Sequence, residues 1–117
     1  MSNYATVEQP NPVKTKDSKE VLTYVLTYLA GFDRNEEQIA KLRTDLILRS
    51  DLGKERYGTR LYSHNGRSAI IDLYQELLDA YFYTTQAIME GKEVKEARAI
   101  RMLVFSALSR VRELLGE

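Results

Sequence analysis

The chain has 117 residues, equal numbers of basic and acidic side chains (17 each), no cysteine and a single histidine, His64. This length suits one domain with its own core. The lack of cysteine excludes disulfides, thiolate metal sites and cysteine nucleophiles, and one histidine argues against a multi-histidine metal cage. Because the net charge is zero, no overall field attracts nucleic acid or an anionic membrane, and neither is an expected partner.

Residues 1–16 are expected to form a flexible tail, followed by a single helical domain at 17–117. The tail contains both prolines of the chain, Pro10 and Pro12, and lacks the apolar stretch of a signal peptide. No apolar run approaches the roughly 18 residues that a membrane-spanning helix needs. A cytoplasmic location is therefore expected.

Two helices are predicted in the first half of the domain, because its apolar residues recur at helical spacing. The first is expected to start near Asp17 or Ser18, either of which can cap free amide groups. The second begins near Asn35 and ends between Gly53 and Gly58.

Two further helices are predicted in the second half, at about 67–90 and 93–115. The loop 58–66 before them ends in Asn65-Gly66, a typical turn dipeptide. At about 100° per residue, apolar side chains cover most of the helix at 67–90, which is typical of a central helix or one shared between subunits. Because four helices joined by short links favour an antiparallel bundle, we predict an all-α, four-helix antiparallel bundle, and the apolar helix at 67–90 predicts that it is oligomeric.

One face of the helix at 67–90 is acidic. Asp72, Glu76 and Asp79 are spaced by four and three residues, and no Lys, Arg or His occurs from Ser68 to Gly91. Like charges at this spacing repel, and a divalent cation would remove the repulsion. Carboxylate oxygens suit Mg²⁺ or Mn²⁺, so these three residues are predicted metal ligands. The alternative is a plain acidic face in contact with solvent.

A second acidic pair, Asp51 and Glu55, lies four residues apart at the end of the second helix. If that helix packs antiparallel to the third, the pair would face Asp72 and Glu76 and complete the metal site. The alternative is capping and surface pairing with nearby basic residues.

The segment before the acidic helix is basic, with Glu55 as its only acid from residue 54 to residue 67. A basic loop beside metal-binding carboxylates fits a metal–polyphosphate ligand, because cations neutralise phosphate oxygens. The predicted phosphate contacts are Lys54, Arg60 and Arg67. The alternative is ordinary surface charge, with Arg67 paired to a carboxylate. Tyr62 and Tyr83 are candidates for stacking on a base.

Two stretches carry a resemblance to a known superfamily. The sequence Glu76-Leu77-Leu78-Asp79, with the hydrophobic helix that follows, resembles the ExxD motif of the all-α nucleoside triphosphate pyrophosphohydrolases, the MazG-like superfamily. The stretch from Arg56-Tyr57-Gly58-Thr59 to His64-Asn65-Gly66-Arg67 is similar to short phage and prophage proteins of that kind.

The resemblance implies a helical bundle that assembles as a homodimer or homotetramer and binds Mg²⁺ through carboxylates of two helices, with Glu76 and Asp79 as the catalytic carboxylates. The implied reaction is cleavage of a (deoxy)nucleoside triphosphate to the monophosphate and pyrophosphate, with water attacking the α-phosphorus. The second acidic motif of the superfamily, EExxE, is incomplete, because Lys41 follows Glu36-Glu37 and no third glutamate does. A non-catalytic nucleotide-binding module, or a structural or adaptor protein of phage type, therefore stays open as an alternative.

Overall fold

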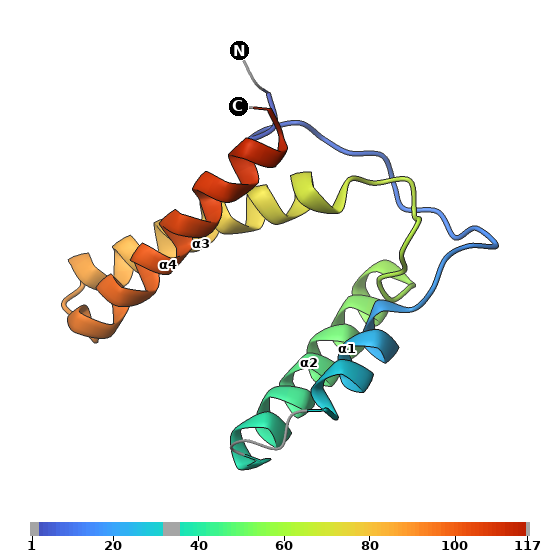
Figure 1. Ribbon diagram of the computed structural model, residues 1–117, viewed down its shortest axis with the longest axis horizontal. Coiled ribbons are helices and arrows are strands. Elements are labelled where there is room, and N and C mark those ends of the chain that lie inside the picture. Colours follow the sequence, from blue (N-terminus) through green and yellow to red (C-terminus); the bar gives the residue numbers. More distant parts are fainter. Residues whose placement is uncertain (1–2, 32–35, 117) are drawn as a thin grey trace. The chain divides into compact units, whose positions relative to one another are not determined.

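The computed structural model describes residues 3–31 and 36–116 and is all-helical over these residues (Figure 1). The helices are α1 (Val21–Leu29), α2 (Glu36–Tyr57), α3 (Ala69–Met89) and α4 (Val94–Leu114). This confirms the predicted all-α class. The described residues contain no β-strand, only an isolated antiparallel bridge between Glu20 and Tyr62. No helix among them is both long and apolar enough to cross a membrane.

The chain divides into two compact units. One unit runs from Pro12 to Gly66 and contains α1 and α2, and the other joins the residues up to Asn11 to the chain from Arg67 onward. The single domain predicted for 17–117 and the flexibility predicted for 1–16 stay predictions.

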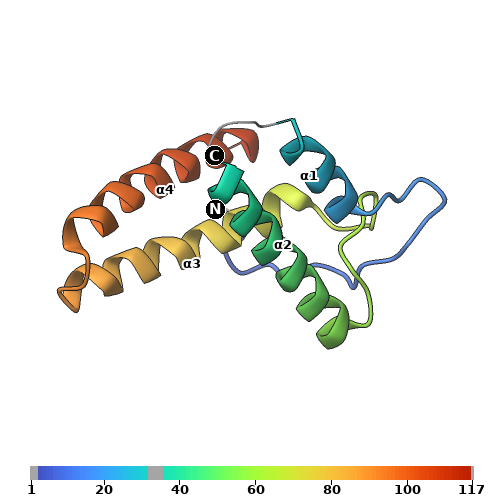
Figure 2. The same cartoon turned by 90° about the horizontal axis from the view of Figure 1, so that it is seen from below.

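In the unit from Pro12 to Gly66, α1 and α2 are in contact (Figures 1 and 2). The prediction that α1 starts near Asp17 or Ser18 is wrong, because these residues bond elsewhere. The Ser18 hydroxyl accepts from the Thr15 amide (2.9 Å) and donates to the His64 carbonyl (3.1 Å). The segment before Val21 therefore pairs with residues 61–64 and cannot join the helix.

The loop predicted at 58–66 folds back on the start of the same unit. The Val13 amide donates to the Asn65 carbonyl (2.8 Å), and the Ser63 amide donates to the Lys19 carbonyl (2.8 Å). Asn65 is buried, and Gly66 has a φ of +82°. The Asn65-Gly66 turn predicted from the sequence thus closes the loop at a backbone angle that side chains disfavour.

The other unit is built on a hairpin of α3 and α4, which lie side by side (Figures 1 and 2). Ser68 caps α3, its hydroxyl accepting from the Ile71 amide (3.2 Å). At the far end Gly91 has a φ of +73°, and the amides of Gly91 and Lys92 donate to the carbonyls of Ile88 and Ala87. This Schellman arrangement satisfies the last carbonyls of α3 and reverses the chain.

Aromatic and basic side chains fill part of the contact between α3 and α4. The rings of Tyr81 and Phe105 lie 6.5 Å apart, and the Arg101 guanidinium lies 5.7 Å from the Tyr81 ring centre. Arg101 also donates to the Thr85 hydroxyl (3.3 Å). Residues from the middle of both helices therefore fix their register.

Residues 3–11, the N-terminal segment, lie against the first half of α3. The Gln75 amide group donates to the carbonyls of Tyr4 (3.0 Å) and Val7 (2.9 Å). Gln9 binds both the backbone and a side chain at the start of α3. This part of the predicted tail therefore makes specific polar contacts with the helix that carries the acidic face.

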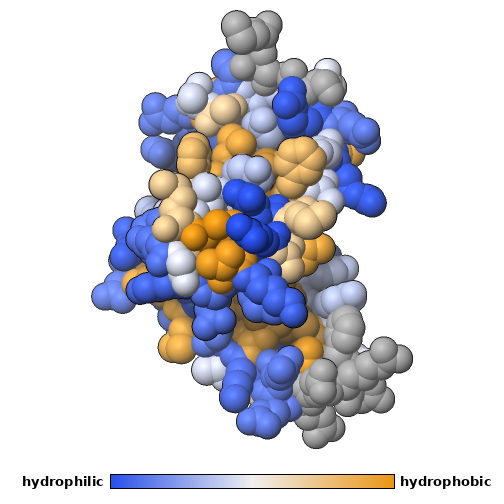
Figure 3. Space-filling model, turned by 90° about the vertical axis from the view of Figure 1, so that its left-hand side faces the viewer, coloured by the Kyte–Doolittle hydropathy of each residue, from blue (hydrophilic) through white to orange (hydrophobic). Residues whose placement is uncertain are grey.

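Few apolar side chains are buried in either unit. Among the described residues these are Leu29, Ala97 and Val111. Many large apolar side chains reach the surface between hydrophilic ones, as Figure 3 shows for one face. A pair of helices covers only one side of each, so the other apolar sides stay exposed.

Candidate metal and nucleotide site on α3

Glu76 and Asp79 lie on the exposed side of α3. Their three-residue spacing places both carboxylates on one side of the helix, a turn apart. Within the described part of the chain, neither carboxylate takes part in a hydrogen bond or an ion pair. No basic residue occurs in α3 to neutralise them. Both oxygens of each carboxylate are therefore free to bind a cation.

Asp72, the third residue of the predicted stripe, is bound to side chains of its own unit. Arg67 donates to both of its oxygens, from Nη2 to Oδ1 (2.7 Å) and from Nε to Oδ2 (3.1 Å). Gln9 donates to Oδ1 from Nε2 (2.7 Å). The ion pair that the sequence left open as the alternative for Arg67 is thus present.

These contacts favour the ionised form of Asp72. The hydrogen bond from Arg67 lowers the pKa of Asp72 below its ordinary value, with Gln9 acting in the same direction and partial burial opposing both. The same hydrogen bond raises the pKa of Arg67. Asp72 is therefore a fixed negative charge whose field is largely neutralised by the adjacent guanidinium.

The predicted ligand Asp51 is also paired with a predicted phosphate contact. Arg60 donates from Nη2 to Asp51 Oδ1 (2.5 Å) and from Nη1 to the Ser50 hydroxyl (2.8 Å). Glu55 and Lys54 lie exposed in the last turn of α2, without an ion pair among the described residues. Two of the three predicted phosphate contacts thus already bind a carboxylate.

The two candidate base contacts differ in their surroundings. Tyr62 is half-buried, with the Lys14 ammonium 4.5 Å from its ring centre. Tyr83 is 67% exposed and lies one helical turn beyond Asp79. Because its ring is open and it lies on the same side of α3 as Asp79, Tyr83 is the better placed of the two for stacking on a bound base.

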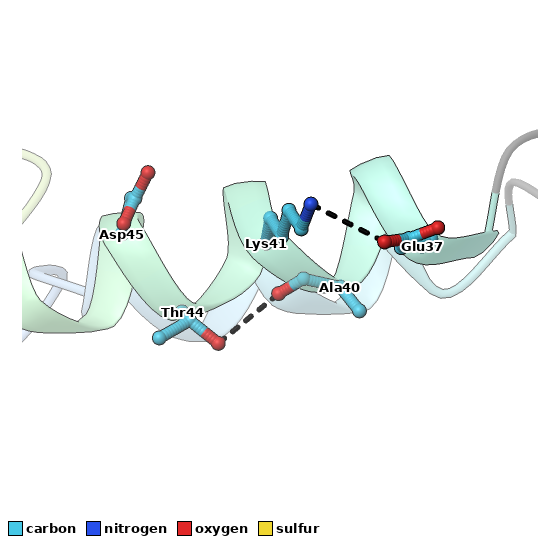
Figure 4. Close-up of a pocket in the computed structure, with 5 residues that line it drawn as sticks. All are labelled: Glu37, Ala40, Lys41, Thr44 and Asp45. Atoms are coloured by element: carbon cyan, nitrogen blue, oxygen red, sulfur yellow. Dashed lines mark hydrogen bonds and ion pairs between the residues drawn. The ribbon is translucent and has the colours of Figure 1, made fainter.

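The incomplete second motif lies on α2 along an open pocket lined by Glu37, Ala40, Lys41, Thr44 and Asp45 (Figure 4). Lys41 forms an ion pair with Glu37 (3.2 Å). Figure 4 shows Lys41 between Glu37 and Asp45 on the same helix. Lys41 therefore neutralises Glu37 within α2.

Within the residues that the structure describes, no three His, Cys, Asp or Glu side chains are grouped closely enough to hold a metal ion. Glu76 and Asp79 nevertheless suit a Mg²⁺ ion that takes its other ligands from water and substrate. Magnesium keeps several waters and is commonly bound through one or two carboxylates together with substrate phosphates. The free pair on α3 therefore suits a cation that arrives with a polyphosphate.

Gln9 is the functional neighbour that the sequence did not reveal. Its Oε1 accepts from the Ser68 amide (2.6 Å), and its Nε2 donates to the Ser68 carbonyl (2.9 Å) as well as to Asp72. A glutamine in a segment rich in proline and small polar residues carries no pattern that predicts a partner about 60 residues away.

Comparisons with known proteins supply no relative from which a role could be transferred. No protein-family model, curated protein or solved structure matches the chain.

Proposed function

We propose that this chain is a Mg²⁺-dependent pyrophosphohydrolase of nucleoside or deoxynucleoside triphosphates. The observation that carries the proposal is the pair Glu76 and Asp79, two exposed carboxylates without partners in the described chain, on a helix with no basic residue. Unpaired like charges one turn apart destabilise a helix slightly, and a bound cation would offset that cost.

In the proposed site, Glu76 and Asp79 hold the cation, and the triphosphate supplies further oxygen ligands. Bound there, Mg²⁺ (or Mn²⁺) would neutralise charge on the triphosphate. A bond forms between a water oxygen and the α-phosphorus, and the bond from the α-phosphorus to the oxygen bridging the β-phosphorus breaks. The nucleoside monophosphate and pyrophosphate leave, with the water proton passing to solvent.

In the proposed site, two of the basic residues would exchange their carboxylate partners for phosphate oxygens. Arg67 and Arg60 each bind a carboxylate, and a phosphate presents similar oxygens to a guanidinium. Lys54 needs no such exchange, because no ion pair engages it within the described residues. Asp51, Glu55 and Asp72 remain proposed supporting ligands, and Asp51 and Asp72 would have to leave their arginines to bind the metal.

The antiparallel bundle and the homodimer or homotetramer predicted from the sequence belong to the same proposal. Large apolar side chains remain exposed in both units, among them Tyr24, Leu48, Phe82 and Leu103. Burial of such side chains against further helices is the usual outcome for amphipathic helices.

The decisive experiment measures pyrophosphate release from a panel of ribo- and deoxynucleoside triphosphates with Mg²⁺ or Mn²⁺. Glu76→Gln and Asp79→Asn should each lower turnover by at least about a hundredfold, the scale expected when an electrostatic contact to the reacting phosphate is lost. Glu113→Gln on α4 is the matched control, because it removes one exposed helical carboxylate away from α3. Equal activity in Glu76→Gln and Glu113→Gln would refute the site.

A nucleotide-binding module without catalysis is the second candidate. It is supported by the ion pairs of Asp72 and Asp51, which occupy two of the five proposed metal ligands. This candidate predicts metal-dependent nucleotide binding without pyrophosphate release. A structural or adaptor protein of phage type, which the exposed apolar side chains support, predicts no binding of either nucleotide or metal.

A further inference from the structure

One side of α4 carries a stripe of apolar residues with one charged residue toward each end, and the hairpin with α3 leaves all of its members exposed except the half-buried Ala107. Its members are spaced by four, three, four, three and four residues: Glu96, Ile100, Leu103, Ala107, Arg110 and Leu114. Ile100, Leu103 and Leu114 are 50%, 72% and 71% exposed. This alternation of three and four is the spacing of a helix that packs along its length against another helix.

The stripe borders the side of α4 that packs on α3, and its outer part, at Leu103, is turned away from that side. The buried residues of α4 are Ala97 and Val111. At about 100° per residue, Leu103 lies roughly a quarter turn or more around the helix from both of them. The hairpin therefore leaves the outer side of the stripe, at Leu103 and Leu114, available for a second partner.

The charges at the two ends of the stripe identify that partner. Glu96 lies seven residues before Leu103, and Arg110 lies seven residues after it. Both are exposed and without an ion pair among the described residues. A helix with opposite charges placed symmetrically about a central leucine complements its own antiparallel copy.

We propose that a second copy of this chain docks on the stripe, with the two α4 helices antiparallel about a twofold axis at Leu103. Glu96 then faces the partner's Arg110 at both ends of the contact. Leu103 meets the partner's Leu103 on the axis, and the large Ile100 lies within one residue's rise of the small Ala107 of the partner subunit. An isologous contact of this kind uses the same patch on both copies and closes as a dimer.

A charge-swap cycle tests the pairing by light scattering after size exclusion and by sedimentation, without nucleotide. Glu96→Arg alone and Arg110→Glu alone should each weaken dimerisation at least about tenfold, because each creates two like-charge contacts per dimer. The double variant restores opposite charges, and its dimer dissociation constant should return to within about threefold of that of the unaltered chain. A double variant no tighter than the single variants, or an unaltered chain that is monomeric at tens of micromolar, would overturn the proposal.

A cysteine pair tests the axis itself, because the chain has no cysteine of its own. Leu103→Cys should form a disulfide-linked dimer under mild oxidation, since side chains on a twofold axis approach within disulfide distance. Met102→Cys is the matched control: Met102 is 73% exposed, as open as Leu103, but points about 100° away around the helix. Equal cross-linking at both positions would contradict the proposed axis.

The proposal does not depend on nucleotide chemistry. The dimer is measured without ligand, and turnover is measured separately with the α3 variants. A dimeric chain without pyrophosphate release would support the α4 contact and refute the enzyme, whereas an active monomer would support the α3 site and refute the α4 contact together with the proposed oligomer.

Discussion

Arg67 donates to both carboxylate oxygens of Asp72, at 2.7 Å and 3.1 Å, and Gln9 donates to one of the same oxygens at 2.7 Å. The start of α3 is thereby joined to the N-terminal segment through three side chains. The ion pair between Arg67 and Asp72 joins a predicted phosphate contact to a predicted metal ligand. Its strength therefore affects both the fold and the proposed chemistry.

The first prediction concerns acid stability. The pKa of Asp72 is lowered in the folded protein, so its stabilising contribution is present above the unfolded-state pKa of about 3.9. That contribution is lost as the pH falls through the lower folded-state pKa. The unaltered protein should therefore exceed Asp72→Asn in free energy of unfolding at pH 7, with the difference shrinking below about pH 4. Urea unfolding from pH 2 to pH 7 measures this, and a difference that is constant with pH would contradict it.

The second prediction concerns the N-terminal segment. Gln9→Ala removes the acceptor of the Ser68 amide and a donor to Asp72. The free energy of unfolding should fall by about 1 kcal/mol, the usual net value of such hydrogen bonds. Amide hydrogen exchange in residues 3–11 should become faster. The control is Glu8→Ala, which changes the exposed neighbour; a Gln9→Ala variant that exchanges no faster than this control would argue against the contact.

The third prediction compares the same substitution at two glycines. Gly53 lies inside α2 with no atom within 4 Å of an added Cβ, whereas Gly66 has a φ of +82°. Gly53→Ala should stabilise the protein by about 0.5–1 kcal/mol, because alanine restricts the unfolded chain and favours helix. Gly66→Ala should destabilise it by about 1–2 kcal/mol, the cost of a side chain in the left-handed region. Thermal unfolding measures whether each variant is more or less stable than the unaltered protein. A change in the same direction for both variants would contradict the prediction.

The fourth prediction follows from the number of free carboxylates. Because Glu76 and Asp79 supply only part of a Mg²⁺ coordination shell, metal alone should stabilise the protein weakly. Metal and nucleotide together should stabilise it by about 2.7 kcal/mol when the complex is at about 100 times its dissociation constant. Thermal-shift titrations with Mg²⁺, with a non-hydrolysable triphosphate and with both measure this linkage. If the thermal shift with both ligands were only the sum of the shifts with metal and with nucleotide alone, the two ligands would not share a site.

The sequence determined the helices because their signals are local. Apolar residues at helical spacing place α3 and α4 close to their predicted ends, and α2 ends within its predicted range, whereas its predicted start near Asn35 lies outside the described residues. The acidic face of α3 was also predictable, since residues three and four apart share a side of any helix.

Only the tertiary structure decided which charges are neutralised and where α1 begins. Ser18 is as good a cap as Ser68 by type, but its hydroxyl is taken by Thr15 and His64 of a folded loop. Asp72 looks equivalent to Glu76 and Asp79 in the sequence, yet Arg67 and Gln9 bind it alone. A helical pattern fixes the direction of a side chain, whereas its partner depends on distant segments whose approach no local spacing encodes.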